Sequence, residues 1–149
     1  MAANPIYIDF EIPGKPVPKG RPRFAGRAGC SGAPVVYTPK TTAEYERKVR
    51  RAAEEQMTLH RYDPTEDALA LEVIFYMRRP KSVPPSRRFP SVKPDIDNLL
   101  KAVVDGMNGV VYADDKLVVD VHVAKRYALA KDEPRVVVRA WSAGHRQGG

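Results

Sequence analysis

The segment from Leu69 to Met77 constrains the fold of this chain more than any other. It reads Leu-Ala-Leu-Glu-Val-Ile-Phe-Tyr-Met, so apolar side chains occupy nearly every position on both faces of an extended segment. A strand that is apolar on nearly both faces is typical of the centre of a sheet. The segment therefore predicts a protein built on a sheet, with residues 69–77 as its central strand.

Three further segments predict the other strands of that sheet. Residues 6–12 alternate apolar and polar side chains, which is typical of a strand with one buried face. Residues 117–126 and 135–141 are the remaining strand segments. The short stretch 128–134 between these two predicts a hairpin connection.

Two segments predict helices. Apolar residues recur at helical spacing after Thr41 and Thr42, either of which can begin the first helix, and Glu44 stands at capping-box spacing from Thr41. The second helix is predicted over residues 97–107, with Asp97 as its N-cap. The expected fold class is therefore α/β (α+β), with a small mixed β-sheet of about four strands and two helices packed on it. The predicted order is β-α-β-α-β-β.

The length of 149 residues indicates one domain, predicted over residues 1–141, followed by a polar tail at 142–149 that we expect to be disordered. The single cysteine, Cys30, excludes an intramolecular disulfide framework and a Cys-based zinc site, and it fits a reducing cytosol. No apolar run approaches the roughly 18 residues of a membrane span, and no signal peptide is visible at the N-terminus. We therefore expect a cytoplasmic protein.

The chain carries a formal net charge of +7, and its lysines and arginines gather in two segments without acids, residues 13–40 and 78–94. Both segments are rich in proline, which predicts loops. Two basic loops are typical of arms that hold a phosphate backbone, although solvated and partly disordered loops would have the same composition. Phe24 and Tyr37 could stack on bases or anchor the first loop. The predicted DNA-binding residues are Lys15, Lys19, Arg21, Arg23, Arg78, Arg79, Arg87, Arg88 and Lys93.

The segment from Pro94 to Asp120 is acidic within this basic chain. Its acids are Asp95, Asp97, Asp105, Asp114, Asp115 and Asp120. Carboxylates brought close together repel unless they share a proton or a cation, and Mg²⁺ is a hard cation that takes such oxygen ligands. Each Asp pair alone is also typical of a helix cap or a turn. Two pairs flanking one short helix, with Lys101 one turn inside it, favour a metal-dependent phosphotransfer site.

The spacing of these residues resembles the signature of the RusA family of Holliday-junction resolvases. The resemblance rests on Asp-Ile-Asp-Asn-Leu-Leu-Lys-Ala at 95–102, then Asp105, then Tyr-Ala-Asp-Asp-Lys-Leu-Val at 112–118. The Lys-Gly-Arg-Pro-Arg-Phe run of the first basic loop and the Tyr-Thr-Pro-Lys run that follows it are similar to phage and prophage members. The resemblance covers most of residues 6–140.

This resemblance implies roles for individual residues. Asp95, Asp97, Lys101 and Asp115 would be catalytic, and the three aspartates would bind Mg²⁺, or Mn²⁺ in its place. Asp114 is a further candidate ligand, whereas Asp105 is expected to cap the helix or to pair with Lys101. The family also implies a homodimer, because a four-way junction has to be nicked symmetrically on two strands.

The expected function is a Mg²⁺-dependent, structure-selective endodeoxyribonuclease that resolves Holliday junctions by paired symmetric nicks in DNA recombination and repair. Its partner would be branched DNA, in a bacterial or phage-infected cell and associated with the nucleoid through DNA. One alternative is a non-catalytic basic module that binds nucleic acid, in which the aspartates only cap and turn. A small-substrate phosphohydrolase is a weaker alternative, because its first Asp normally ends a buried strand and here Pro-Ser-Val-Lys-Pro precedes Asp95.

Overall fold

The computed structural model describes residues 5–20, 23–24, 36–37, 40–129 and 132–144 of the chain. Its elements in chain order are β1 (Tyr7–Pro13), β2 (Arg23–Phe24), β3 (Val36–Tyr37), α1 (Lys40–Leu59), β4 (Leu69–Met77), α2 (Ile96–Met107), the 3-10 helix η1 (Asp115–Leu117), β5 (Val118–Tyr127) and β6 (Arg135–Ser142). The predicted mixed α+β class is confirmed, and the short β2–β3 pair is an addition to the predicted order. In the part of the chain described here, no helix is long and apolar enough to cross a bilayer.

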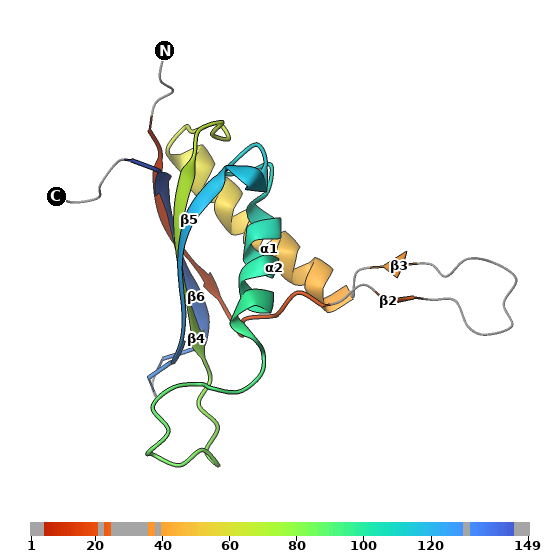
Figure 1. Ribbon diagram of the computed structural model, residues 1–149, viewed down its shortest axis with the longest axis vertical. Coiled ribbons are helices and arrows are strands. Elements are labelled where there is room, and N and C mark those ends of the chain that lie inside the picture. The colour runs from red at the N-terminus through yellow and green to blue at the C-terminus, as the bar shows by residue number, and fades with distance from the viewer. Residues whose placement is uncertain (1–4, 21–22, 25–35, 38–39, 130–131, 145–149) are drawn as a thin grey trace, which may run out of the picture.

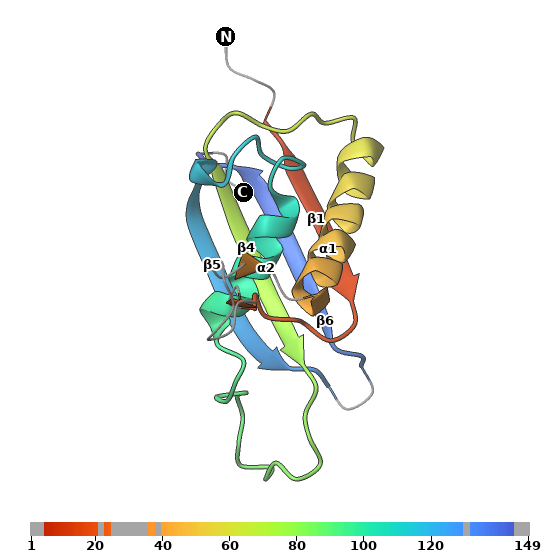
Figure 2. The same cartoon turned by 90° about the vertical axis from the view of Figure 1, so that its right-hand side faces the viewer.

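The main sheet has four strands in the order β1-β6-β4-β5 (Figure 2). Strand β4 pairs in parallel with β5 and antiparallel with β6, and β6 pairs antiparallel with β1. The interior position predicted for residues 69–77 is therefore confirmed, with bounds that match the prediction.

The predicted hairpin between the last two strands is wrong. Strands β5 and β6 are consecutive in the chain, but β4 lies between them. The physical reason is backbone pairing, because β4 bonds in parallel to β5 along one edge and antiparallel to β6 along the other. The connection that follows β5 starts beside the end of β4. There the Ala128 N–H donates to the Met77 carbonyl at 2.8 Å.

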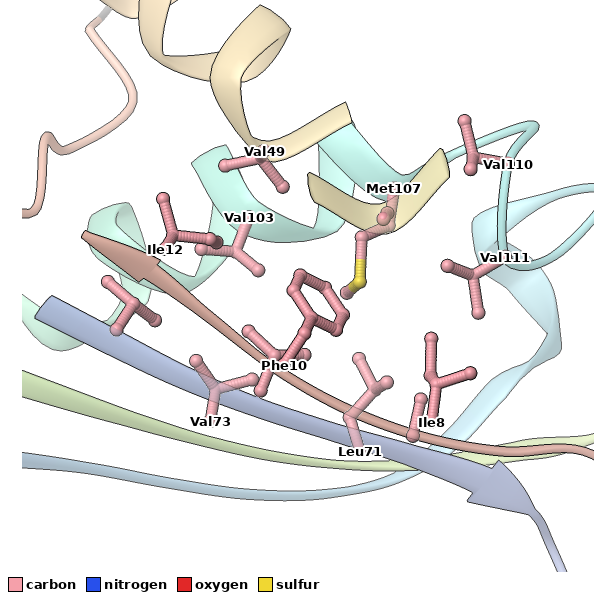
Figure 3. Packing of buried hydrophobic residues seen from close by; sticks show 14 of the residues in the cluster. Ile8, Phe10, Ile12, Val49, Leu71, Val73, Val103, Met107, Val110 and Val111 are labelled. Carbon is pink, nitrogen blue, oxygen red and sulfur yellow. The ribbon is translucent and has the colours of Figure 1, made fainter. Parts of the chain in front are cut away.

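Both helices cover the same face of the sheet, and the core lies between them and the strands (Figures 1 and 3). Phe10 of β1 and Val73 of β4 meet Val49 of α1 and Met107 of α2 there, and all four are buried. Helices α1 and α2 approach closely at Gly106, where an added Cβ would lie 2.7 Å from the Val49 Cβ. A glycine at this point therefore sets the spacing of the two helices.

Three predicted boundaries shift. Helix α1 begins at Lys40, so Thr41 lies inside the helix instead of capping it. Helix α2 begins at Ile96 with Asp95, not Asp97, in the N-cap position. Strand β6 extends to Ser142, whose side chain accepts a hydrogen bond from the Ile6 N–H at 2.9 Å. Ser142 is thus part of the sheet and not of the predicted tail, of which residues 145–149 lie outside the described part.

Candidate active site

Asp95 and Asp97 lie at the start of α2, directly after the basic loop that follows β4 (Figure 2). Asp95 has an extended backbone (φ −71°, ψ 146°), and its carbonyl accepts the first helical hydrogen bond, from the Leu99 N–H at 3.1 Å. Its side chain makes no capping hydrogen bond within the described residues. Both carboxylates are exposed, so both are accessible to a ligand in solvent.

The two aspartates line a shallow, open cleft of about 760 Å³ between the loop 78–94 and β5. The loop contributes Phe89 to Lys93, and β5 contributes His122 to Arg126. Three cations stand along this cleft, namely Lys93, Lys125 and Arg126. The acidic pair therefore sits in a groove with basic walls, which suits a phosphate backbone brought next to a divalent cation.

Lys125 fixes the end of the basic loop against the sheet. Its ammonium donates to the carbonyls of Val92 and Pro94, each at 2.8 Å. The bond to Pro94 holds the residue just before Asp95. Sequence reasoning missed Lys125, although a lysine two residues after Val123, on the same side of a strand, interrupts the apolar alternation and could have indicated it.

Lys101 pairs with Asp105 one turn further along α2, as predicted. The Lys101 Nζ lies 3.2 Å from Asp105 Oδ1. The other carboxylate oxygen, Oδ2, lies 3.1 Å from the Nζ of Lys19, which also lies 2.7 Å from Glu46 Oε2 of α1. Burial by itself lowers the pKa of Lys19, but the hydrogen bonds and charges of Glu46 and Asp105 outweigh it and raise the pKa overall. Lys19 is therefore a partly buried, charged residue that is held by two acids.

Asp114 and Asp115 lie at the other end of α2. Asp114 caps η1, because its carboxylate accepts from the Lys116 N–H at 3.1 Å, and this bond lowers its pKa. Asp115 lies near Tyr112, whose hydroxyl donates to the Val104 carbonyl at 2.6 Å. Burial raises the pKa of Tyr112, and the negative charges of Asp115 and Asp105 raise it further.

The topology separates the two aspartate pairs within one chain. Helix α2 connects two parallel strands, so it runs from the end of β4 back to the start of β5. Its twelve residues span about 18 Å. Among the described residues no three or more His, Cys, Asp or Glu side chains form a group that could hold a metal ion. One chain thus offers Asp95 and Asp97 as a pair, and the predicted role of Asp115 stays a prediction.

A pair of carboxylates suits Mg²⁺. This ion keeps several waters and is commonly bound by one or two carboxylates together with substrate phosphates, not by a complete protein cage. Asp95 and Asp97 therefore fit the ion that the sequence predicted, as two carboxylate ligands.

The predicted DNA-binding residues fall into two groups. Lys15, Arg78, Arg87, Arg88 and Lys93 are exposed. Arg79 is engaged within its own loop, where it donates to the carbonyls of Pro84 at 2.7 Å and Arg87 at 2.8 Å. Arg79 thus shapes the loop that presents the exposed cations.

Part of the first basic segment lies outside the described residues. Arg21 and Cys30 belong to this part, and of Arg23, Phe24 and Tyr37 the structure describes only the β2–β3 backbone.

An aromatic residue missed by sequence reasoning is Phe89, which is 55% exposed at the cleft and has the Arg126 guanidinium 5.7 Å from its ring centre.

Two comparisons with known proteins bear on the family to which this chain belongs. Residues 13–140 match the family described as Endodeoxyribonuclease RusA. The chain is also 33% identical over 142 residues to the uncharacterized protein YqaN of Bacillus subtilis (strain 168), and the match covers 88% of this chain and 93% of that protein. The family match includes both basic segments and both aspartate pairs, and it confirms the resemblance read from the sequence. The chain therefore belongs to the RusA endodeoxyribonuclease family.

Proposed function

We propose that this protein is a divalent-metal-dependent endonuclease that cuts Holliday junctions by paired nicks, in DNA recombination and repair. The observation that carries the proposal is the acidic pair Asp95–Asp97 in the shallow cleft that Lys93, Lys125 and Arg126 also line. Family membership supplies the class of reaction. A small-substrate phosphohydrolase is less well supported, because Asp95 follows an exposed basic loop and not a buried strand.

The charged side chains on α2 and at its two ends would have two roles, which are to bind the cation and to stabilise the phosphate. Asp95 and Asp97 would hold Mg²⁺ or Mn²⁺, with Asp114 as a further candidate ligand. The bound ion would polarise the phosphate and supply an activated water. Lys101, on the turn after Asp97, would place its ammonium near the charge that develops on the phosphate and stabilise it. Its side chain is 55% exposed, so it is accessible to DNA.

The exposed cations would hold the DNA backbone. Arg78, Arg87, Arg88 and Lys93 belong to the loop that extends beyond the end of the sheet, and Lys15 lies in the first basic segment (Figures 1 and 2). Contacts of this kind fix the position of DNA without reading its sequence. They suit an enzyme that selects DNA by shape.

The separation of the aspartate pairs supports a homodimer with shared sites. Because α2 keeps Asp115 away from Asp95 and Asp97 of the same chain, Asp115 would join them only from a second copy. Two copies related by a twofold axis would then form two such sites, one for each strand to be nicked.

Mixed dimers test this arrangement. Asp97→Asn and Asp115→Asn chains should each be inactive alone, whereas a mixed dimer would contain one site with neither substitution. Co-expression of the two chains with different affinity tags should therefore restore nicking of one strand per junction. If the purified mixed dimer does not nick, the sites are not shared between chains.

The catalytic proposal is tested by incubating the protein with a four-way junction and with linear duplex of the same sequence, with and without Mg²⁺. We expect paired nicks in the junction only, and only with the cation. Asp97→Asn should abolish cleavage and leave junction binding equal or tighter, because less negative charge then faces the phosphates. Tight junction binding by the unaltered protein without cleavage under any divalent cation would instead identify a non-catalytic binding module.

A further inference from the structure

Lys19 belongs to the first basic segment, residues 13–40, which the sequence assigned to DNA binding. Its ammonium, however, is already paired with two carboxylates of the protein. It lies 2.7 Å from Glu46 and 3.1 Å from Asp105, and its side chain is only 23% exposed. Lys15, four residues earlier in the same loop, is exposed. The two lysines therefore differ in environment although they carry the same charge.

The backbone around Lys19 is fixed as well. The Lys19 N–H donates to the Asn98 carbonyl at 2.8 Å, next to Asp97 in the first turn of α2. The Gly20 N–H donates to the Thr42 hydroxyl at 2.9 Å, and this buried hydroxyl lies 3.3 Å from the Pro18 carbonyl. The loop is thus attached to both helices at the point where it passes the first turn of α2.

Asp105 links this attachment to Lys101. One of its oxygens contacts Lys19 and the other contacts Lys101, at 3.1 and 3.2 Å. Asp105 is 20% exposed and Glu46 is 22% exposed, so both carboxylates are shielded from solvent compared with surface pairs. Lys19 is the cation between these two acids, so without it they would repel each other and Asp105 would keep only one of its two partners.

We propose that Lys19 and Glu46 are positioning residues, which hold Asp105 so that Asp105 holds the Lys101 ammonium in place for the phosphate. The role of Lys101 in this statement rests on the proposed function. The raised pKa of Lys19 keeps its charge through the neutral and mildly alkaline range, as the network requires. Lys19 accordingly contributes to the rate of cleavage and not to the affinity for DNA.

A comparison of Lys19→Met with Lys15→Met tests whether Lys19 contributes to the rate of cleavage and Lys15 to the affinity for DNA. Lys19→Met should lower the single-turnover rate at saturating junction by about 10- to 100-fold, the usual effect of misplacing a reacting group. Its junction affinity and the salt dependence of binding should change little. Lys15→Met should instead weaken binding and lower the slope of log affinity against log salt by about 0.9.

Two further variants separate positioning from general damage to the fold. Lys19→Arg keeps both ion pairs and should recover most of the rate. Glu46→Gln should reduce the rate without altering the loop, whereas Glu54→Gln, on the exposed face of the same helix, should not. If Lys19→Met matches Lys15→Met in affinity and salt slope and keeps the full rate at saturation, Lys19 is a DNA contact and the proposal is wrong.

A readout without DNA tests the network independently of catalysis. The rate of Lys101 acetylation, measured by mass spectrometry relative to the exposed Lys81, should rise in Asp105→Asn. The expected increase is about two- to tenfold, because the Lys101 amine is then released from its ion pair. If the unaltered protein cuts no junction but acetylation responds, the proposed function fails and the network stands. If it cuts junctions and neither acetylation nor rate responds, the network fails and the function stands.

Discussion

At the scale of single residues, the structure divides side chains of one type by their surroundings. Lys15 and Lys19 look alike in the sequence, as do Arg79 and Arg87, but Lys19 and Arg79 are held by groups of the protein, whereas Lys15 and Arg87 are exposed. The aspartates divide in the same way. Asp105 and Asp114 have partners within the protein, whereas Asp95 leaves its side chain out of the helix cap. Composition predicts such residues as candidates, but contacts between distant segments decide their roles.

Tyr112 gives a prediction about alkaline stability. Because burial and two nearby acids raise its pKa above the ordinary value of about 10, the folded protein keeps the phenol proton where the unfolded chain loses it. The contribution of Tyr112 to the free energy of unfolding is therefore complete below pH 10 and falls as the pH rises further. Tyr112→Phe should lose about 1 kcal/mol at pH 7, through the bond to Val104, and should show a smaller decline between pH 10 and 11.

Urea unfolding of both proteins at pH 7, 10 and 11 measures this difference. An equal alkaline decline in the two proteins would show that the Tyr112 proton is not linked to folding. The measurement at pH 7 serves as the internal control, because the phenol is neutral in both states there.

At the scale of elements, the sequence predicted local structure well and pairing less well. Periodicity is a local property, so it located β1, β4, α1 and α2 to within one or two residues. It could not predict that β6 inserts between β1 and β4, because strand order depends on which apolar faces remain uncovered after the other elements pack. The same limit applies to Asp115, because the sequence did not show that α2 runs from the end of β4 back to the start of β5.

Gly106 tests the close contact of α1 and α2. Glycine to alanine inside a helix normally stabilises by about 0.5–1 kcal/mol. At Gly106 the added methyl would meet the Val49 Cβ at 2.7 Å and the Glu46 carbonyl at 3.1 Å. Gly106→Ala should therefore destabilise, by about 1–3 kcal/mol. A thermal or urea midpoint that rises instead would show that the helices are not in contact there.

At the scale of the whole molecule, the net charge of +7 is distributed unevenly. Cations gather in the loop beyond the end of the sheet and along the cleft, and the acids that face them are those of the proposed metal site. A general attraction to DNA follows from net charge alone. Orientation of one phosphate toward Asp95 and Asp97 requires cations at particular places.

Matched double variants distinguish the effect of net charge from the effect of cations placed in the loop. Arg87→Ala with Arg88→Ala removes two exposed cations of the loop, and the salt slope of junction binding should fall by about 0.9 for each phosphate that is no longer neutralised. Arg47→Ala with Arg51→Ala makes the same change in net charge on the exposed face of α1. Binding titrations at several salt concentrations compare them. Equal slopes in the two double variants would show that the loop acts through net charge only.

The hydrogen bonds that Lys125 donates to the carbonyls of Val92 and Pro94 have a consequence for how the sequence of this loop can vary. They anchor the loop at its junction with α2, while β4 anchors its other end. The intervening residues can therefore change in length and sequence during evolution without displacing Asp95. Recognition of new DNA shapes would then be acquired by exchanging this insert between relatives, with the reacting groups left as they are.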